Sequence, residues 1–352
     1  MNRMQRIRAG VLALAAACLL AACDGKPGET EGGAQAIKGA GATFPQPLYE
    51  RWIGEYRAEH PEVSFTYQGV GSGEGVKRFL DGEVDFGASD AAMTDADLEK
   101  VDPDRGAVMI PMTAGMVVLA YNIPGVGKGL RLARDVYQDI FAGKIRKWND
   151  PRIAGTNPGL DLPSAEVVTV VRRDSSGTTF AFTNHLAAAN PWWATQGPGI
   201  GKLVDWPGNA MTAAGNEGVA QRVKITSGAI GYMGYEVANR LELPMAILQN
   251  KAGEFVVPGP GAGQAALAAA DEIPADLRVY VPDPEGSASY PIVTYTWILL
   301  NANYADPAKA QALKEALGWG LGQGQAIAEE LGYIPLPESM ILRATEALTR
   351  VR

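Results

Sequence analysis

Residues 172–178 place two arginines, an aspartate, two serines, a glycine and a threonine between a predicted strand and a predicted helix. The apolar run 167–171 predicts a buried strand, and residues 179–189 predict a helix. The first N–H groups of a helix lack intrahelical partners and carry the positive end of the helix dipole. Arginine adds a planar fork of donors for an oxyanion, and hydroxyl groups add further donors. The stretch therefore predicts either an anion site or an ordinary capped helix start.

Two more glycine-rich turns precede predicted helices. Residues 38–47 lead into an amphipathic helix over 48–56, which places the N–H groups of Thr43 and Phe44 at a helix start. Residues 69–75 follow a predicted strand over 63–68 and place Ser72 before a helix over 76–80. The dinucleotide pattern G-x-G-x-x-G is not met there, and no Walker A spacing is present, so nucleotide binding is not expected.

The remaining elements alternate between strands and helices. A short strand over 85–90 ends in Asp90, which could be a helix cap, a surface residue or an acceptor in a site. Residues 108–122 form a long apolar run broken by proline and glycine, and residues 215–218 open another helix. The stretch 258–263 is rich in proline and glycine and is expected to be a return linker before a strand over 290–300. This alternation predicts open α/β sheets, and the length suits two domains.

Composition excludes several classes of function. The formal charge is −8, and loss of a leader with three arginines and no acid would make it more negative still. Such a chain is not expected to bind nucleic acid through its general field. The two cysteines, Cys18 and Cys23, lie in the first segment, so the rest can form no disulfide or thiolate metal site. The two histidines, His60 and His185, are expected on the surface, and neither is expected to be a catalytic base.

The N-terminus has the pattern of a secretory signal. Residues 1–8 are basic, and residues 9–22 form an apolar run too short for a comfortable membrane span. The segment ending at Cys23 resembles a bacterial lipobox, which predicts a signal peptide over 1–23 and a lipid anchor on Cys23. A plain signal peptide with an incidental cysteine is the alternative. Asp24 resembles a signal for retention at the inner membrane, and residues 24–36 predict a flexible tether.

Several motifs, in their order and spacing, resemble one family. They span residues 39–45, 67–73, 84–90, 141–150, 172–178, 228–232 and 290–292. Together they resemble the periplasmic phosphate-binding proteins of ABC phosphate importers, the PstS family. The resemblance implies a class II periplasmic binding protein with two α/β lobes, a hinge and a ligand cleft between the lobes. Residues 37–112 and 258–352 would form the first lobe, and residues 113–257 the second.

The resemblance also implies a set of phosphate ligands. Asp90 would accept the proton of the bound ligand, Arg172 would pair with the phosphate, and Asp174 would clamp that arginine, with Arg173 as the competing choice. The implied hydrogen-bond donors to phosphate are Thr43, Phe44, Ser72, Ser176, Gly177 and Thr178. Two residues depart from the family pattern: Glu74 would repel a dianion unless it points away, and Ser175 replaces a common glycine. No catalytic residue, metal or cofactor is expected.

The expected function is capture of inorganic phosphate in the periplasm and delivery to a membrane permease. A buried Asp90 would favour phosphate over sulfate, because sulfate at neutral pH has no proton to donate and would leave the carboxylate unpaired. One alternative keeps the fold and binds another oxyanion such as arsenate or phosphite. The others are a secreted phosphate-ester hydrolase, and an adhesion or signalling lipoprotein that kept the fold.

Overall fold

The computed structural model describes residues 35–208, 210–269 and 273–352. The predicted signal peptide, the lipobox Cys23 and the predicted tether up to residue 34 lie outside the described residues. Strand β1 (Gln35–Gly41) begins two residues before the expected start of the fold, so Gln35 and Ala36 belong to a strand. No helix among the described residues is long and apolar enough to span a membrane.

One large sheet organises the fold, in the order β2-β1-β3-β11-β4-β8-β6-β7. Its other strands are β2 (Val63–Gly69), β3 (Phe86–Ser89), β11 (Val293–Leu300), β4 (Val108–Asn122), β8 (Ala229–Gly234), β6 (Val168–Arg172) and β7 (Met211–Ala213). Strands β5 (Arg131–Leu132), β9 (Ile247–Gln249) and β10 (Phe255–Val256) form a small second sheet. The long β4 joins the two halves of the large sheet, because its first part pairs with β11 and its second part, from Val117, pairs with β8.

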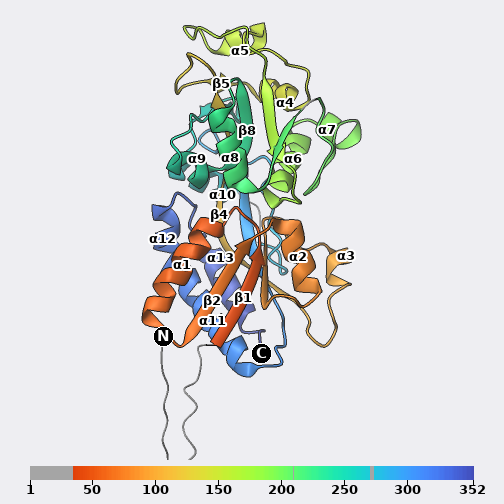
Figure 1. Cartoon of the computed structure of the whole chain (residues 1–352), viewed down its shortest axis with the longest axis vertical. Helices are drawn as coiled ribbons and strands as arrows, with labels where there is room; N and C mark the ends of the chain where they lie inside the picture. The colour runs from red at the N-terminus through yellow and green to blue at the C-terminus, as the bar shows by residue number, and fades with distance from the viewer. Residues whose placement is uncertain (1–34, 209, 270–272) are drawn as a thin grey trace, which may run out of the picture. The chain divides into compact units, whose positions relative to one another are not determined.

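Helices surround each half of this sheet (Figure 1). In the first half the helices are α1 (Gln46–Glu59), α2 (Ser72–Leu80), α3 (Asp95–Leu98), α11 (Pro307–Leu321), α12 (Gly324–Glu330) and α13 (Glu338–Leu348). In the second half they are α4 (Arg134–Phe141), α5 (Pro151–Thr156), α6 (Gly177–Ala189), α7 (Trp192–Thr195), α8 (Gly215–Ile225) and α9 (Tyr235–Arg240). The predicted class, an open α/β fold in two halves, is confirmed.

Residues 258–263 do not form the expected linker, because α10 (Pro260–Ala268) begins among them. Proline fits the first turn of this helix, where no N–H donor is needed. Residues beyond this helix contact the second half of the fold: the carbonyls of Gly286, Ser287 and Ser289 accept hydrogen bonds from the side-chain amide of Asn250, which lies between β9 and β10. The stretch after residue 258 therefore also contacts the second half of the fold, and the predicted lobe boundaries stay a prediction.

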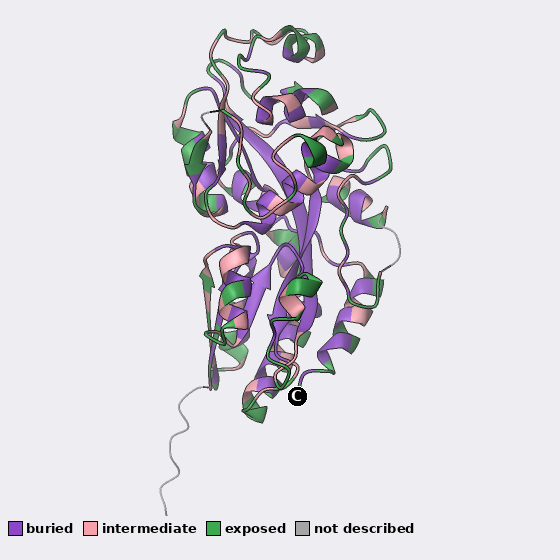
Figure 2. Ribbon diagram, turned by 90° about the vertical axis from the view of Figure 1, so that its right-hand side faces the viewer, coloured by how far each residue is buried: buried purple, intermediate pink, exposed green. Residues whose placement is uncertain are grey.

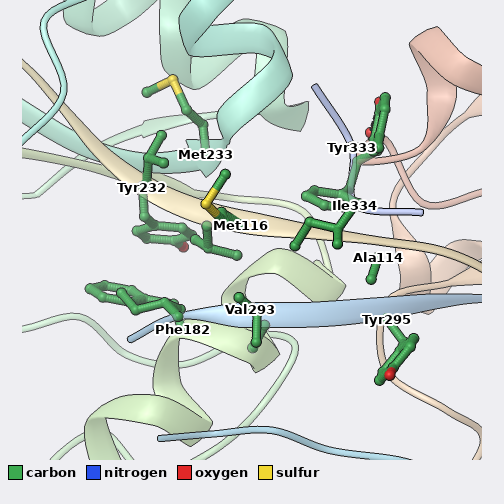
Figure 3. Packing of buried hydrophobic residues seen from close by; sticks show 14 of the residues in the cluster. Ala114, Met116, Phe182, Tyr232, Met233, Val293, Tyr295, Tyr333 and Ile334 are labelled. Carbon is green, nitrogen blue, oxygen red and sulfur yellow. Dashed lines mark hydrogen bonds between the residues drawn. The ribbon is translucent and has the colours of Figure 1, made fainter. Parts of the chain in front are cut away.

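The core follows β4 and β11, whose residues are almost all buried (Figure 2). Strands covered on both faces read as continuous apolar runs. Pro111 lies beside the register shift between Thr296 and Trp297, and such an irregularity is where a sheet tolerates proline. Side chains from both halves pack where β4 crosses between them (Figure 3). The labelled residues there include Met116 of β4, Met233 of β8, Val293 of β11 and Ile334, whose backbone bridges to Ala114.

Candidate functional site

The predicted ligand residues follow the carboxyl ends of parallel strands from both halves of the sheet. Thr43 and Phe44 follow β1, Ser72 begins α2 after β2, and Asp90 follows β3. Arg172 ends β6, and residues 176–178 open α6. The carboxyl ends of strands in open α/β sheets are the usual place for ligands. The structure therefore gathers elements from distant parts of the sequence at one edge.

Contacts across the two halves show how closely these turns approach one another. The N–H of Gly73, in α2, donates to the carbonyl of Ser175 at 2.9 Å. Gly177, at the start of α6, lies so near the first half that a β-carbon there would be 2.5 Å from Ser72 Oγ and 2.6 Å from Asp90 Cβ. Only glycine permits this approach.

Arg172 forms the cationic centre of the site. Its side chain is 1% exposed and makes a bidentate contact with Asp174 through Nε, at 2.8 Å, and Nη2. Burial tends to raise the pKa of Asp174, but the hydrogen bonds and charge of Arg172 outweigh it and hold that pKa below its usual value. Arg173 is exposed, so the geometry favours Arg172 as the arginine that faces the site.

Asp90 is a buried carboxyl at the centre of the same group. Thr296, on β11, donates to Asp90 Oδ1 at 2.8 Å, and the Asp90 N–H donates to Ser72 Oγ at 3.1 Å. Burial raises the pKa of Asp90 to about 7, although Thr296, the charge of Arg172 and the hydroxyls of Thr178 and Ser72 act in the opposite direction. The carboxyl can therefore serve as a proton acceptor near neutral pH.

The donors of the site come from the start of α6 and from the turn between β1 and α1, where one backbone N–H has no acceptor among the described residues. Ser176 caps α6 by accepting the N–H of Thr179 at 3.1 Å, and Gly177 and Thr178 contribute first-turn N–H groups. The ring of Phe44 is fully buried, and its carbonyl accepts a hydrogen bond from Tyr333 at 2.7 Å. Within the described part of the chain, the N–H of Phe44 has no acceptor and remains free for a ligand.

Asn216 is a residue of the site that the sequence did not single out. It is fully buried at the start of α8, and its backbone N–H and Nδ2 donate to Thr43 Oγ1 at 3.2 and 3.3 Å. Its Nδ2 also lies 3.4 Å from Thr178 Oγ1, and its Oδ1 accepts the N–H of Gly234. The signal was present, since residues 215–218 predicted another glycine-rich helix start, but nothing local indicated that it would reach Thr43.

Comparisons with known proteins agree with this arrangement. A family model described as a PBP superfamily domain matches residues 27–318. The phosphate-binding protein PstS of Pasteurella multocida is 39% identical over 310 residues, which cover 88% of each chain. PstS of Methanocaldococcus jannaschii is 37% identical over 337 residues, which cover 90% of this chain and 86% of the relative.

The chain belongs to the PstS family of phosphate-binding proteins. Solved structures show the same fold. A high-affinity periplasmic phosphate-binding protein bound with phosphate at pH 8.5 has a TM-score of 0.73 and 21% identity, over 88% of this chain and 92% of that one. A phosphate-binding protein from Stenotrophomonas maltophilia has a TM-score of 0.71 and 22% identity, over 89% and 94% of the two chains.

Glu74 and Ser175 are the two residues that depart from the PstS pattern. Glu74 is partly exposed and forms an ion pair with Arg78 of the same helix at 2.8 Å, so its charge is directed at that arginine. Ser175 does not have a positive φ. Within the described chain, only Glu242 and Leu277 among the non-glycine residues have a positive φ. The carboxylate of Glu74 is therefore already paired, and Ser175 occupies a position that does not need a glycine.

The expectation for His185 was wrong, whereas His60 is partly exposed as expected. His185 is fully buried in α6, where Nε2 lies 2.9 Å from the Tyr137 hydroxyl and Nδ1 lies 2.7 Å from the Pro282 carbonyl. Burial lowers its pKa to about 4, so it is neutral. Neither of its hydrogen-bond partners is a predicted ligand residue, so both ring nitrogens are engaged away from the predicted site.

A cavity of about 410 Å³ opens beside the site, and Thr43, Asp174 and Asn216 contribute to its wall. Among the residues that the structure describes, no group of three or more histidines, cysteines or carboxylates is placed to hold a metal ion. The donor set instead consists of N–H groups, hydroxyls and one arginine, which is the chemistry that suits an oxyanion.

Gly177→Ala is expected to lower phosphate affinity, because the new β-carbon would overlap Ser72 and Asp90 when the halves meet. Overpacking costs about 1–3 kcal/mol, which corresponds to roughly a 5- to 150-fold loss. Gly218→Ala is the matched control, since that helical glycine has its nearest neighbour at an ordinary 3.5 Å. Calorimetric titration of both variants is the measurement, and equal affinities would contradict the close approach at Gly177.

Proposed function

We propose that this protein binds inorganic phosphate in the periplasm and delivers it to the permease of an ABC phosphate importer. The observation that carries the proposal is the meeting of Arg172 and Asp90, from opposite halves of the sheet, among the N–H groups and hydroxyls of helix starts. Relatives named phosphate-binding protein PstS and a similar structure described as bound with phosphate support the choice of ligand.

Each residue of the site has a specific role in this proposal. Arg172, held by Asp174, pairs with the phosphate, and Asp90 accepts the proton that phosphate still carries. The proposed hydrogen-bond donors are Thr43, Phe44, Ser72, Ser176, Gly177 and Thr178. Since Asn216 binds two of these donors, it positions Thr43 and Thr178 when the two halves meet.

Capture and release depend on movement of the two lobes. The first lobe consists of residues 37–112 and 258–352, and the second consists of residues 113–257. Strand β4 passes between the lobes and provides one of the connections about which they can turn. Phosphate shifts the equilibrium only through its greater affinity for the closed arrangement, in which both lobes contact it. The closed form then docks on the permease, and no covalent step is needed.

Calorimetric titration of the domain that follows Cys23, after removal of bound phosphate, tests this proposal. We expect tight one-to-one binding of phosphate and no response to sulfate. Equal binding of both ions would keep the fold and overturn the selectivity assigned to Asp90. Binding of neither, with a response to arsenate or phosphite, would replace phosphate with another oxyanion.

We also propose that Cys23 carries lipid and anchors the protein at the periplasmic face of the inner membrane. The support is the lipobox pattern that ends at Cys23, followed by Asp24, which resembles the signal for retention at the inner membrane. More than one acyl chain on the cysteine would give stable anchoring. Expression with labelled palmitate should label the wild-type chain and leave Cys23→Ser unlabelled. Equal labelling of both chains would refute lipidation at this cysteine, and fractionation of the membranes would decide between inner and outer anchoring.

A further inference from the structure

Tyr232 is a fully buried tyrosine of β8, and its hydroxyl reaches the end of β6. The paired residues of β6 and β8 end at Val170 and Gly231, one position before Tyr232. Beyond that point, the backbone N–H of the buried Arg172 donates to the Tyr232 hydroxyl at 3.1 Å. The residue that ends β6 is therefore held by a side chain of the neighbouring strand.

The same hydroxyl also reaches the first turn of α6. It lies 2.7 Å from Thr179 Oγ1, and either oxygen can be the donor. The N–H of Thr179 is used separately, because it donates to Ser176 Oγ in the helix cap. The turn between Arg172 and Thr179 contains Asp174 and the predicted donors 176–178. The hydroxyl therefore joins the two ends of the turn that carries these residues.

The ring of Tyr232 is held in place along one side of α6 (Figure 3). Its centroid lies 4.8 Å from that of Phe182, which follows Thr179 by one turn of the helix, and 5.6 Å from that of Trp206. Burial raises the pKa of Tyr232 to about 12, so the hydroxyl is protonated at neutral pH. It is thus a fixed, neutral hydrogen-bond partner for the two elements that it joins.

We propose that Tyr232 is a positioning residue of the phosphate site, which sets the place of Arg172 relative to the first turn of α6. The inference rests on the proposed function. One anion can contact both the guanidinium of Arg172 and the N–H groups of Gly177 and Thr178 only if β6 and α6 keep a fixed separation. Asp174 orients the guanidinium, whereas Tyr232 fixes the backbone from which that side chain extends.

Tyr232→Phe removes the hydroxyl and keeps the ring. In calorimetric titration of the phosphate-stripped protein, we expect its phosphate affinity to fall by roughly 5- to 30-fold, because a buried N–H at a ligand residue loses its acceptor. Tyr290→Phe is the matched control, since Tyr290 is also fully buried but its hydroxyl has no hydrogen-bond partner within the described residues. The control should bind as the wild type does, and equal affinities in all three proteins would overturn the inference.

A double-mutant cycle separates positioning from a merely structural role. Arg172→Lys keeps a backbone N–H at the end of β6 but lacks the planar fork that has to be aimed. If Tyr232 acts through the arginine, Tyr232→Phe should weaken binding clearly less in the Arg172→Lys background than in the wild type. Two losses that multiply in full would show that the tyrosine acts independently of Arg172, and the inference would be wrong.

Thr179 provides the test if Tyr232→Phe does not fold. Thr179→Val removes one partner of the hydroxyl but keeps the capping N–H, and it should weaken phosphate binding, whereas Thr179→Ser should bind as the wild type does. Unchanged binding in Thr179→Val would then contradict the inference.

The outcomes also separate this inference from the proposed function. A wild type that binds no phosphate would overturn both. Tight binding by the wild type that Tyr232→Phe leaves unchanged would overturn the role of Tyr232 alone.

Discussion

Arg172→Ala is expected to abolish tight phosphate binding. The substitution removes the cation of the site and leaves the carboxylate of Asp174 without its bidentate partner. Truncation of one member of a buried charge pair costs about 2–5 kcal/mol, which is roughly a thirty-fold to several-thousand-fold loss of affinity. Titration with phosphate at constant salt and pH, with thermal unfolding to show that the variant folds, is the measurement.

Two further variants make this prediction specific. Arg173→Ala removes the adjacent exposed arginine and should leave the affinity within a few-fold of the wild type. Arg172→Lys keeps the charge but loses the planar fork, and it should bind phosphate more weakly than the wild type. If Arg173→Ala lost binding while Arg172→Ala kept it, the assignment of the pairing arginine would be wrong.

Asp90→Asn is expected to relax the preference for phosphate over sulfate. In the proposed site the wild-type carboxylate accepts the proton of phosphate, whereas sulfate would face it with lone pairs only. An unpaired buried polar group costs about 1–3 kcal/mol, so the ratio of the two affinities should fall by roughly 5- to 150-fold. Part of this change should be a gain in sulfate binding, because the amide can donate to a sulfate oxygen.

Separate titrations with phosphate and sulfate give the ratio for each protein. Asp135→Asn is the control, since that carboxylate is 74% exposed and pairs with Arg152 away from the site. The control should keep the wild-type selectivity. An unchanged ratio in Asp90→Asn would show that another feature excludes sulfate.

Much of the site could be predicted from short motifs, because helix starts and turns depend on neighbouring residues. The glycine and hydroxyl residues around Thr43, Ser72 and Thr178 indicated where helices would begin, and these helices do begin there or within a few residues. The contact between Arg172 and Asp174 was expected from the resemblance to the PstS family, and the structure contains it. The order of strands and helices was sufficient for the fold class.

Contacts between distant segments could not be predicted from those motifs. Thr296 reaches Asp90 only because β11 lies beside β3 in the sheet, although more than 200 residues separate them. In the same way, Asn216 meets Thr43 across the two halves, at a separation of 173 residues.

Burial was the other property that only the tertiary structure decided. His185 was expected on the surface but is enclosed by Tyr137 and Pro282, and Glu236 is enclosed where β4 crosses between the halves. The sequence by itself determined the turns of the proposed site, because their geometry is local. Which side chains support those turns, and which carboxyls are protonated, depends on the order of strands in the sheet, because that order sets what covers each group.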